Sequence, residues 1–319
     1  LGVRTPQQLM DAKLHATLSA CGMNETMTYS FAAADDVEKL RMNEEGLGEA
    51  AELINPMNAE QSCMRRTIVP GLLRSVAYNQ SRGVSNIQLY EIGTVFSARE
   101  GAAQPKERRK LAGVLAGAMG PVGWNNAPAA FDFFDGKGVL ESIARALALP
   151  KVRFKALSAE EAPHLQPGRA AQMLSGGDVV GWVGEIHPLA ADAFEAAAPV
   201  VAFELDMAVL ERAARPARDY VDVPQFPAVA RDAAFVVDES VTNEKLMQCM
   251  TSAGGKLLEG VQLFDVYRDE ERIGAGKKSM AYSLTYRAAD RTLTSEEVDK
   301  AHDRLVKKVS NATGAEQRA

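Results

Sequence analysis

A carboxylate, an aromatic ring and a hydroxyl recur near the C-terminus, on two segments with the pattern of neighbouring strands. Asp265 and Tyr267 are two residues apart, as side chains on one face of a strand are, and Ser279 begins the next alternating segment after Lys277 and Lys278. A tyrosine can stack on an unpaired base, a carboxylate can accept the N–H donors of a guanine, and ammonium groups can hold phosphates. The group predicts a single-stranded RNA site.

The same two segments also fit a hairpin whose polar face is only solvated. Charged loops such as the one between them are usually just hydrated. In either case one face should pack on a core, and we expect that face to carry Phe264, Val266, Met280, Tyr282, Leu284 and Tyr286. These segments alone leave both interpretations open.

The surrounding pattern predicts a ferredoxin-like βαββαβ unit. A strand over 232–237 precedes a helix that starts at Thr242 and is stopped by glycines at 254–255. After the strand pair, Thr294 opens a second helix with a capping box, and residues 314–318 are expected to add a closing strand.

The N-terminal two thirds of the chain predicts a sheet with flanking helices. Thr5 to Gln8 form a capping box with proline at the first helical position, and a second helix follows Pro70. A third helix is expected after Asp135 and a short one over 207–214. The predicted strands are 26–31, 53–58, 87–97, 111–118, a hairpin over 172–185, and 200–206.

The composition is that of an ordinary globular protein of about two domains. The 319 residues are 46% hydrophobic and 24% charged, with a net charge of −6. Residues 221–319 carry 14 basic and 16 acidic side chains, so neither this part nor the whole chain is strongly basic. Nucleic acid would have to bind through local basic patches, and DNA is not an expected partner.

The three cysteines, Cys21, Cys63 and Cys249, are far apart and lack the spacing of a zinc site or a disulfide framework. No apolar run approaches the roughly 20 residues of a membrane helix, and the start has no signal-peptide pattern. We therefore expect a cytoplasmic protein without a membrane partner and without a bound metal. The start at Leu1 suggests a fragment of a longer chain.

Several ordered motifs resemble the β subunit of phenylalanyl-tRNA synthetase along nearly the whole chain. F-P-A-V-A-R-D-A-A-F-V-V-D, L-F-D-V-Y, G-K-K-S-M-A-Y and R-T-L-T-S-E-E-V, at 226–238, 263–267, 276–282 and 291–298, resemble its anticodon-binding domain. The motifs at 55–79, 89–96, 133–142 and 184–188 resemble its catalytic-like module. The resemblance implies an α+β fold, in which a class II synthetase-like antiparallel sheet with flanking helices over 1–214 is joined by a linker at 215–221 to a ferredoxin-like domain over 222–319.

The resemblance also implies partners and roles for the C-terminal residues. The holoenzyme would have two α and two β subunits and would join phenylalanine to tRNA(Phe) with ATP and magnesium at a site on the α subunit. In this chain, Asp265 and Ser279 would pair with a guanine edge and Tyr267 would stack. Phosphate contacts are expected from Arg231, Lys277 and Lys278.

Arginines on a strand of a working class II enzyme would hold the α-phosphate of ATP, and Arg65 and Arg66 are the candidates here. The alternative, which we favour, is that they contact the partner subunit together with Pro70 and Leu73 of the following helix. The strand over 181–186 has no arginine after it, where an active site would need one. No catalytic residue and no bound cofactor are therefore expected in this fragment.

The sequence leaves two other functions open. In the first, residues 1–214 form an enzyme that activates an amino acid by itself, which a pyrophosphate-exchange assay would reveal. Alternatively, the second domain would dock protein rather than RNA and the chain would serve assembly alone. Gel filtration with an α subunit and then with tRNA separates this possibility from anticodon binding.

Overall fold

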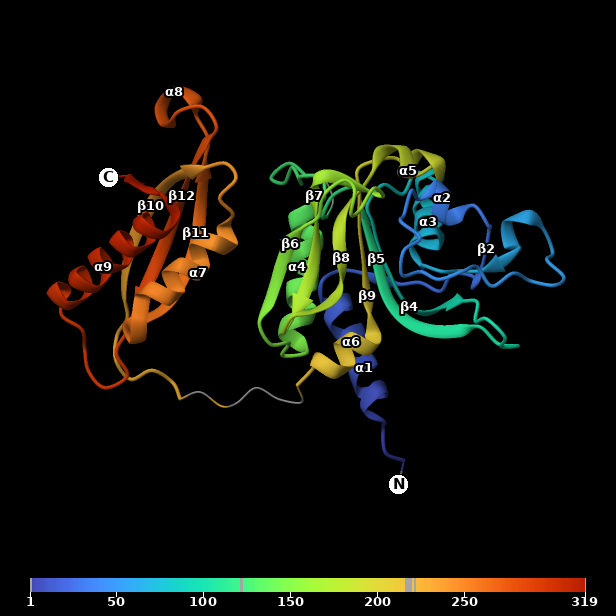
Figure 1. Cartoon of the computed structure of the whole chain (residues 1–319), viewed down its shortest axis with the longest axis horizontal. Coiled ribbons are helices and arrows are strands. Elements are labelled where there is room, and N and C mark those ends of the chain that lie inside the picture. Colours follow the sequence, from blue (N-terminus) through green and yellow to red (C-terminus); the bar gives the residue numbers. More distant parts are fainter. Residues whose placement is uncertain (1, 121–122, 216–219, 221, 319) are drawn as a thin grey trace. The chain divides into compact units, whose positions relative to one another are not determined.

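The computed structural model describes all residues except 1, 121–122, 216–219, 221 and 319. The chain divides into two compact units, Leu1–Arg218 and Asp219–Ala319, and each is described by itself (Figure 1). The predicted linker over 215–221 falls mostly outside the described residues.

A seven-stranded sheet forms the centre of the first unit, in the order β1-β4-β5-β9-β8-β7-β6. Its strands are β1 (Asn24–Glu25), β4 (Ile87–Ser97), β5 (Lys106–Ala116), β6 (Val152–Ala156), β7 (Leu165–Ser175), β8 (Asp178–Ile186) and β9 (Val200–Asp206). Neighbouring strands are antiparallel except β1 and β4, which are parallel. A small second sheet pairs β2 (Phe31–Ala32) with β3 (Cys63–Met64).

Helices cover both faces of this sheet, which gives the unit three layers. The helices are α1 (Pro6–Ala20), α2 (Asp36–Lys39), α3 (Val69–Gln80), α4 (Phe133–Ala146), α5 (Pro188–Ala193) and α6 (Met207–Ala213), with a 3-10 turn η1 at Ala59–Gln61. Leu14 of α1 and Leu140 of α4 belong to the core on one face, and Leu72 of α3 and Ala190 of α5 to the core on the other. The α+β class predicted from the sequence is confirmed.

The local signals that begin the helices act as the sequence predicts. The Thr5 hydroxyl accepts a hydrogen bond from the Gln8 backbone N–H at 3.2 Å, and the Gln8 side chain accepts one from Thr5 N–H at 3.0 Å. The helix expected after Asp135 begins slightly earlier, because Asp132 caps it by accepting from the N–H of Phe134 at 2.7 Å.

Two predicted strands of the first unit do not form as such. Residues 26–30 lie between β1 and β2 without belonging to a ladder, and the Thr28 N–H donates to the Glu91 carboxylate at 3.1 Å. Residues 53–58 form bends around Asn55-Pro56, and strand-like pairing is limited to an isolated bridge at Glu52.

The second unit is a four-stranded antiparallel sheet in the order β11-β12-β10-β13. Along the chain its elements are β10 (Val229–Asp238), α7 (Asn243–Gly254), a 3-10 turn η2 (Gly255–Leu257), β11 (Leu258–Tyr267), α8 (Glu270–Ile273), β12 (Lys277–Tyr286), α9 (Ser295–Thr313) and β13 (Glu316–Arg318). This is the predicted βαββαβ arrangement with one extra helical turn, α8, between the middle strands.

Both long helices of the second unit pack on one face of its sheet (Figure 1). Leu246 of α7 and Leu305 of α9 are fully buried in the same core as Phe235, Tyr282 and Tyr286 of the strands. Side chains of the strands that alternate with these core residues therefore lie on the opposite, helix-free face.

Of the helices in the described part of the chain, none combines the length and apolar character that crossing a bilayer would need. The described residues also bring together no group of three or more His, Cys, Asp or Glu side chains that could hold a metal ion.

His164 is buried in the first unit, and both of its ring nitrogens lack a hydrogen-bond partner among the described residues. Its ring meets Trp182 edge-on, with 4.8 Å between centroids. Burial disfavours the charged imidazolium and lowers the pKa of His164 to about 4.

This burial predicts an acid-dependent loss of stability. Between pH 6.5 and 4 the unfolded chain binds a proton at His164 that the folded chain does not, so stability falls as the pH falls through this window. At pH 4.5 the loss should be about 2–3 kcal/mol relative to pH 7. Urea unfolding at both pH values should show that His164→Phe removes a loss of this size, and an unchanged pH dependence would contradict the assignment.

Candidate nucleic-acid and subunit interfaces

The strand register of the second unit builds a row of side chains across the helix-free face. From β11 to β13, successive strands contribute Asp265, Ala281, Ala234 and Arg318. Residues directly opposite in antiparallel ladders project to the same side. Because Tyr282, next to Ala281, is buried in the core, this row lies on the face away from the helices.

A second row on the same face consists of Tyr267, Ser279, Val236 and Glu316. The predicted common face of Asp265, Tyr267 and Ser279 is therefore confirmed. Asp265 is exposed and has no hydrogen-bond partner among the described residues, whereas Ser279 is only 4% exposed. The carboxylate is thus the more accessible polar group of the pair.

A bulge in β11 turns these residues toward the helix-free face. The register shifts between Leu263, which lies opposite Tyr282 and packs against the core, and Asp265, which lies opposite Ala281. Phe264 is the extra residue and is 56% exposed, so the prediction that it packs on the core was wrong. Without the bulge, Leu263 and Asp265 would share a face.

The ring of Tyr267 is held by its own hydroxyl. The hydroxyl donates to Asp269 Oδ2 at 2.6 Å, and Asp269 also caps α8 by accepting from the N–H groups of Glu271 and Arg272. The hydrogen bond raises the pKa of Tyr267, and the same bond lowers the pKa of Asp269. A neutral ring in a fixed orientation is a suitable stacking surface for a base.

The basic residues predicted to contact phosphates lie on both sides of the sheet. Lys277 alternates with the core positions and so belongs to the helix-free face, where its Nζ lies 3.5 Å from Glu316. Lys278 is 8% exposed and donates to the backbone carbonyl of Glu239 at 2.8 Å. Arg231 lies on the helix side and donates to Asp299 of α9 at 3.0 Å. Lys278 and Arg231 therefore do not share the face of Asp265.

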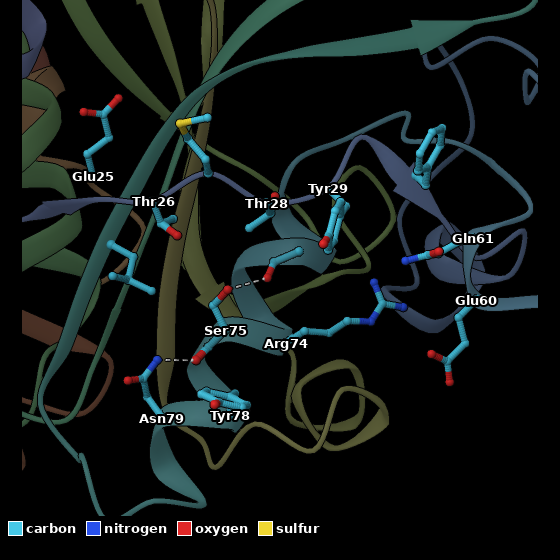
Figure 2. A pocket seen from close by; sticks show the side chains of 14 residues that line it. Glu25, Thr26, Thr28, Tyr29, Glu60, Gln61, Arg74, Ser75, Tyr78 and Asn79 are labelled. Carbon is cyan, nitrogen blue, oxygen red and sulfur yellow. Dashed lines mark hydrogen bonds between the residues drawn. The ribbon is translucent and has the colours of Figure 1, made fainter. Parts of the chain in front are cut away.

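The first unit carries a hollow of about 650 Å³ at the β1 edge of its sheet, between the segment 24–31 and helix α3 (Figure 2). Large apolar side chains are unusually exposed around it: Met27 is 88% exposed, Tyr29 78% and Tyr78 58%. In Figure 2, Tyr29 and Tyr78 lie on either side of the Arg74 side chain. An apolar rim beside an edge strand is typical of a protein-binding surface.

A buried ion pair holds this rim in place. Arg65 Nη1 lies 2.7 Å from Glu91 Oε1, and the two side chains are 7% and 4% exposed. Thr28 donates its N–H and its hydroxyl to Glu91 Oε2 at 3.1 and 2.6 Å, and Arg65 Nε donates to Thr94 O at 2.8 Å. The pair therefore fixes the backbone between Met27 and Tyr29.

The residues predicted to form the subunit interface are all buried within the first unit: Arg65, Arg66, Pro70 and Leu73. Arg66 pairs with Glu44 at 3.2 Å and donates to Gly48 O. These four residues do not themselves form an exposed contact surface, and Leu73 belongs to the apolar stripe that faces the unit's own core. Their proposed part in the interface stays a prediction, in which they would support the surface from beneath.

Two exposed residues of the same region, Arg74 and Tyr78, were not among the residues predicted from the sequence. Arg74 and Tyr78 lie one helical turn apart on the side of α3 opposite Leu72 and Val76. The apolar stripe of a helix also shows which face is exposed. The sequence of α3 therefore contained the signal that would have identified Arg74 and Tyr78. Arg318 was expected only as part of a closing strand, and nothing in the local sequence places it beside Tyr267.

The geometry defines an α+β protein with a three-layered sheet unit and a ferredoxin-fold unit, whose helix-free face carries an aromatic ring and a carboxylate. Residues 1–207 match the family described as phenylalanyl tRNA synthetase beta chain CLM domain. Residues 224–318 match the ferredoxin-fold anticodon binding domain. The chain belongs to the phenylalanyl-tRNA synthetase beta chain family.

Its curated relatives are longer proteins. The phenylalanine–tRNA ligase beta subunit of Symbiobacterium thermophilum is 39% identical over 319 residues, which is 100% of this chain and 35% of that protein. The subunit of Geobacillus kaustophilus is 37% identical over 315 residues, 98% of this chain and 38% of that protein. The solved pyrrolysyl-tRNA synthetase of Desulfitobacterium hafniense aligns with 64% of this chain and 67% of its own at 16% identity and a TM-score of 0.48. The chain thus spans well under half of the length of these two ligase beta subunits.

Proposed function

We propose that this chain is a non-catalytic part of the β subunit of a cytoplasmic phenylalanine–tRNA ligase, where it binds the tRNA(Phe) anticodon and scaffolds the α subunit. The observation that carries the proposal is the common face of Asp265 and Tyr267 in a domain of the anticodon-binding family. Relatives that bear the name of the ligase's beta subunit support it.

The helix-free face supplies the chemistry that reading an unpaired base needs. The exposed Asp265 carboxylate can accept the N–H donors of a guanine, and the fixed Tyr267 ring can stack on the base. Lys277 lies on the same face and would contact a nearby phosphate. Ser279 is almost completely buried, so it would join the guanine contact only where the edge of the base reaches the sheet itself.

The α subunit is proposed to cover the apolar rim of the first unit. Binding energy at protein interfaces is concentrated in a few residues, often tyrosine and arginine. Tyr29, Tyr78 and Arg74 around one hollow fit that description. A partner there would bury the rings of Tyr29 and Tyr78, which are 78% and 58% exposed in this chain.

ATP and magnesium are proposed to act on the α subunit of the holoenzyme rather than on this chain. The guanidinium groups of Arg65 and Arg66 are buried and engaged with Glu91 and Glu44, so neither is available to an α-phosphate. The residues present therefore do not fit a nucleotide at this place, and no catalytic step is assigned to them.

The RNA proposal predicts that Tyr267→Ala weakens tRNA(Phe) binding by about 1–3 kcal/mol through the loss of one base stack. Asp265→Asn should reduce discrimination at one anticodon base, because the amide offers both a donor and an acceptor where the carboxylate only accepts. Filter binding or fluorescence anisotropy at fixed moderate salt measures both effects.

Matched controls for these variants lie elsewhere in the chain. Tyr29→Ala removes an exposed tyrosine of the first unit, and Asp303→Asn neutralises an exposed carboxylate on α9. Both should leave tRNA affinity unchanged in the absence of an α subunit. Unaltered binding by Tyr267→Ala and Asp265→Asn would refute the anticodon assignment.

A further inference from the structure

A second hollow, of about 400 Å³, lies over the central strands of the first unit's sheet, and we name it the Trp182 hollow. Gln172 of β7, Trp182 of β8 and Glu204 of β9 line it and lie directly opposite one another in their ladders. Residues opposite each other in antiparallel ladders project to the same side, so these three side chains share one face of the sheet. Trp182 packs against the core of α3 and α5, which identifies this face as the one that those helices cover.

Two segments outside the sheet wall the Trp182 hollow and are held by hydrogen bonds. Arg108 of β5 donates to two backbone carbonyls of the loop 42–47, at 3.1 and 3.0 Å. Asn43 of this loop donates in turn to two backbone carbonyls of the segment 157–162, at 2.9 and 3.2 Å. The walls are therefore tied both to the sheet and to each other.

The charged side chains around the Trp182 hollow already have partners. Lys110 Nζ lies 3.5 Å from Asp206 Oδ2, and Glu161 pairs with a lysine of β6 at 3.2 Å. Glu204 accepts from a hydroxyl and a backbone N–H of the segment before α3, at 3.0 and 3.1 Å. Of the described charged residues that line the hollow, only Glu45 has no such partner, and it is exposed to water. A charged ligand would therefore find no free counter-charge inside.

The polar groups that lack partners are uncharged. His164 is 6% exposed, and neither of its ring nitrogens has a hydrogen-bond partner among the described residues. The side chains of Gln172 and Trp182 also form no hydrogen bond within the described part of the chain. A neutral imidazole and a primary amide each offer a donor and an acceptor, and an indole offers a donor. Because an unpaired buried polar group costs free energy, a ligand that pairs with these groups is favoured.

We propose that the Trp182 hollow binds a small uncharged aromatic amide, whose ring packs on Trp182 and whose amide pairs with His164 and Gln172. The volume of about 400 Å³ is within the range of small-molecule sites. An amide donates at its N–H and accepts at its carbonyl, so it matches both side chains without bringing a charge. The Trp182 ring meets His164 edge-on, with 4.8 Å between centroids, and the imidazole nitrogens have almost no accessible surface. The indole therefore moves off the imidazole as the ligand enters.

The site is tested with benzamide as the probe and the 319-residue chain carrying Trp124→Phe. Trp124 is 97% exposed, and its replacement leaves Trp182 as the only tryptophan of this chain. Excited at the red edge of tryptophan absorption, Trp182 should show a saturable change in emission with a Kd of about 1 mM or tighter. Benzoate has the same shape but a charged group that only accepts, so it should bind at least about tenfold more weakly.

Two variants and a control locate the bound probe. His164→Phe and Gln172→Leu should each weaken benzamide binding about tenfold or more and leave the weak binding of benzoate unchanged. Gln248→Leu removes the same amide from an exposed position on α7 of the second unit and should leave Kd within about twofold. Gln172 is only half-buried, so Gln172→Leu decides the question where urea unfolding shows that His164→Phe does not fold.

Three results would each overturn the amide site. These are the absence of a saturable change with benzamide, equal affinities for benzamide and benzoate, and benzamide affinity that is retained by either folded variant. Because anticodon binding is measured separately with tRNA(Phe), none of these results touches the proposed function.

Discussion

Arg65→Leu is expected to lower the free energy of unfolding of the first unit by about 3–5 kcal/mol. The substitution leaves the Glu91 carboxylate, 4% exposed, without its cationic partner in the interior, and an unpaired buried charge is among the most destabilising single changes. Both tryptophans, Trp124 and Trp182, belong to the first unit, so tryptophan fluorescence during urea unfolding reports on this unit alone.

The neighbouring arginine provides a matched control. Glu44, the partner of Arg66, is 69% exposed, so Arg66→Leu leaves a carboxylate that water can solvate and should cost at most about 1 kcal/mol. Adding Glu91→Leu to Arg65→Leu should restore part of the lost stability, because no buried charge then remains. Equal losses for the two single arginine variants would contradict the role assigned to the buried pair.

Tyr29→Ala is expected to weaken binding of the α subunit by about 2 kcal/mol or more, which is roughly 30-fold in Kd. Tyr29 is 78% exposed beside the hollow at the sheet edge, so its truncation should leave the fold of the chain intact while it removes an anchor. Titration of a labelled chain with purified α subunit measures the change.

Phe134, an exposed aromatic residue on the other face of the sheet, provides the control for a general loss of apolar surface. Phe134 of α4 is 72% exposed and lies outside the hollow. Phe134→Ala should therefore leave the affinity for the α subunit within about twofold. Comparable losses for Tyr29→Ala and Phe134→Ala would mean that the hollow is not the contact surface.

Sequence periodicity and capping signals were sufficient for most elements of the fold. The strand expected over 87–97 has those bounds in the structure, and the capping boxes at Thr5 and Thr294 begin α1 and α9. These features are local, because a ladder residue alternates and a cap bonds to a residue three positions away. The βαββαβ order followed from the same signals.

The features that the sequence did not predict depend on contacts between residues far apart in the sequence. The bulge at Phe264 allows Leu263 to contact the core while Asp265 lies on the opposite face of the sheet. The alternation of side chains in the sequence does not predict this bulge. Arg318 Cζ lies 5.3 Å from the centroid of the Tyr267 ring, although the two residues belong to the two edge strands of the assembled sheet. Long-range register of this kind is fixed by the tertiary structure.

The buried interface residues illustrate the same limit. The resemblance singled out Arg65 as a candidate phosphate or subunit contact, but its partner Glu91 lies on β4, and only the fold brings the two together. The sequence thus predicted the helix that follows Arg66, whereas the side chains that face outward from it depend on the assembled fold.

The central claim, that the helix-free face of the second unit reads an anticodon, is tested most directly by titrating the chain with tRNA(Phe) and with a copy altered only in its anticodon, at one moderate salt concentration. Each base that is correctly read should be worth roughly 1–3 kcal/mol, so the unaltered tRNA should bind about 5- to 150-fold more tightly. Equal affinity for the two RNAs, with Tyr267→Ala indistinguishable from the original chain, would contradict anticodon reading by this face.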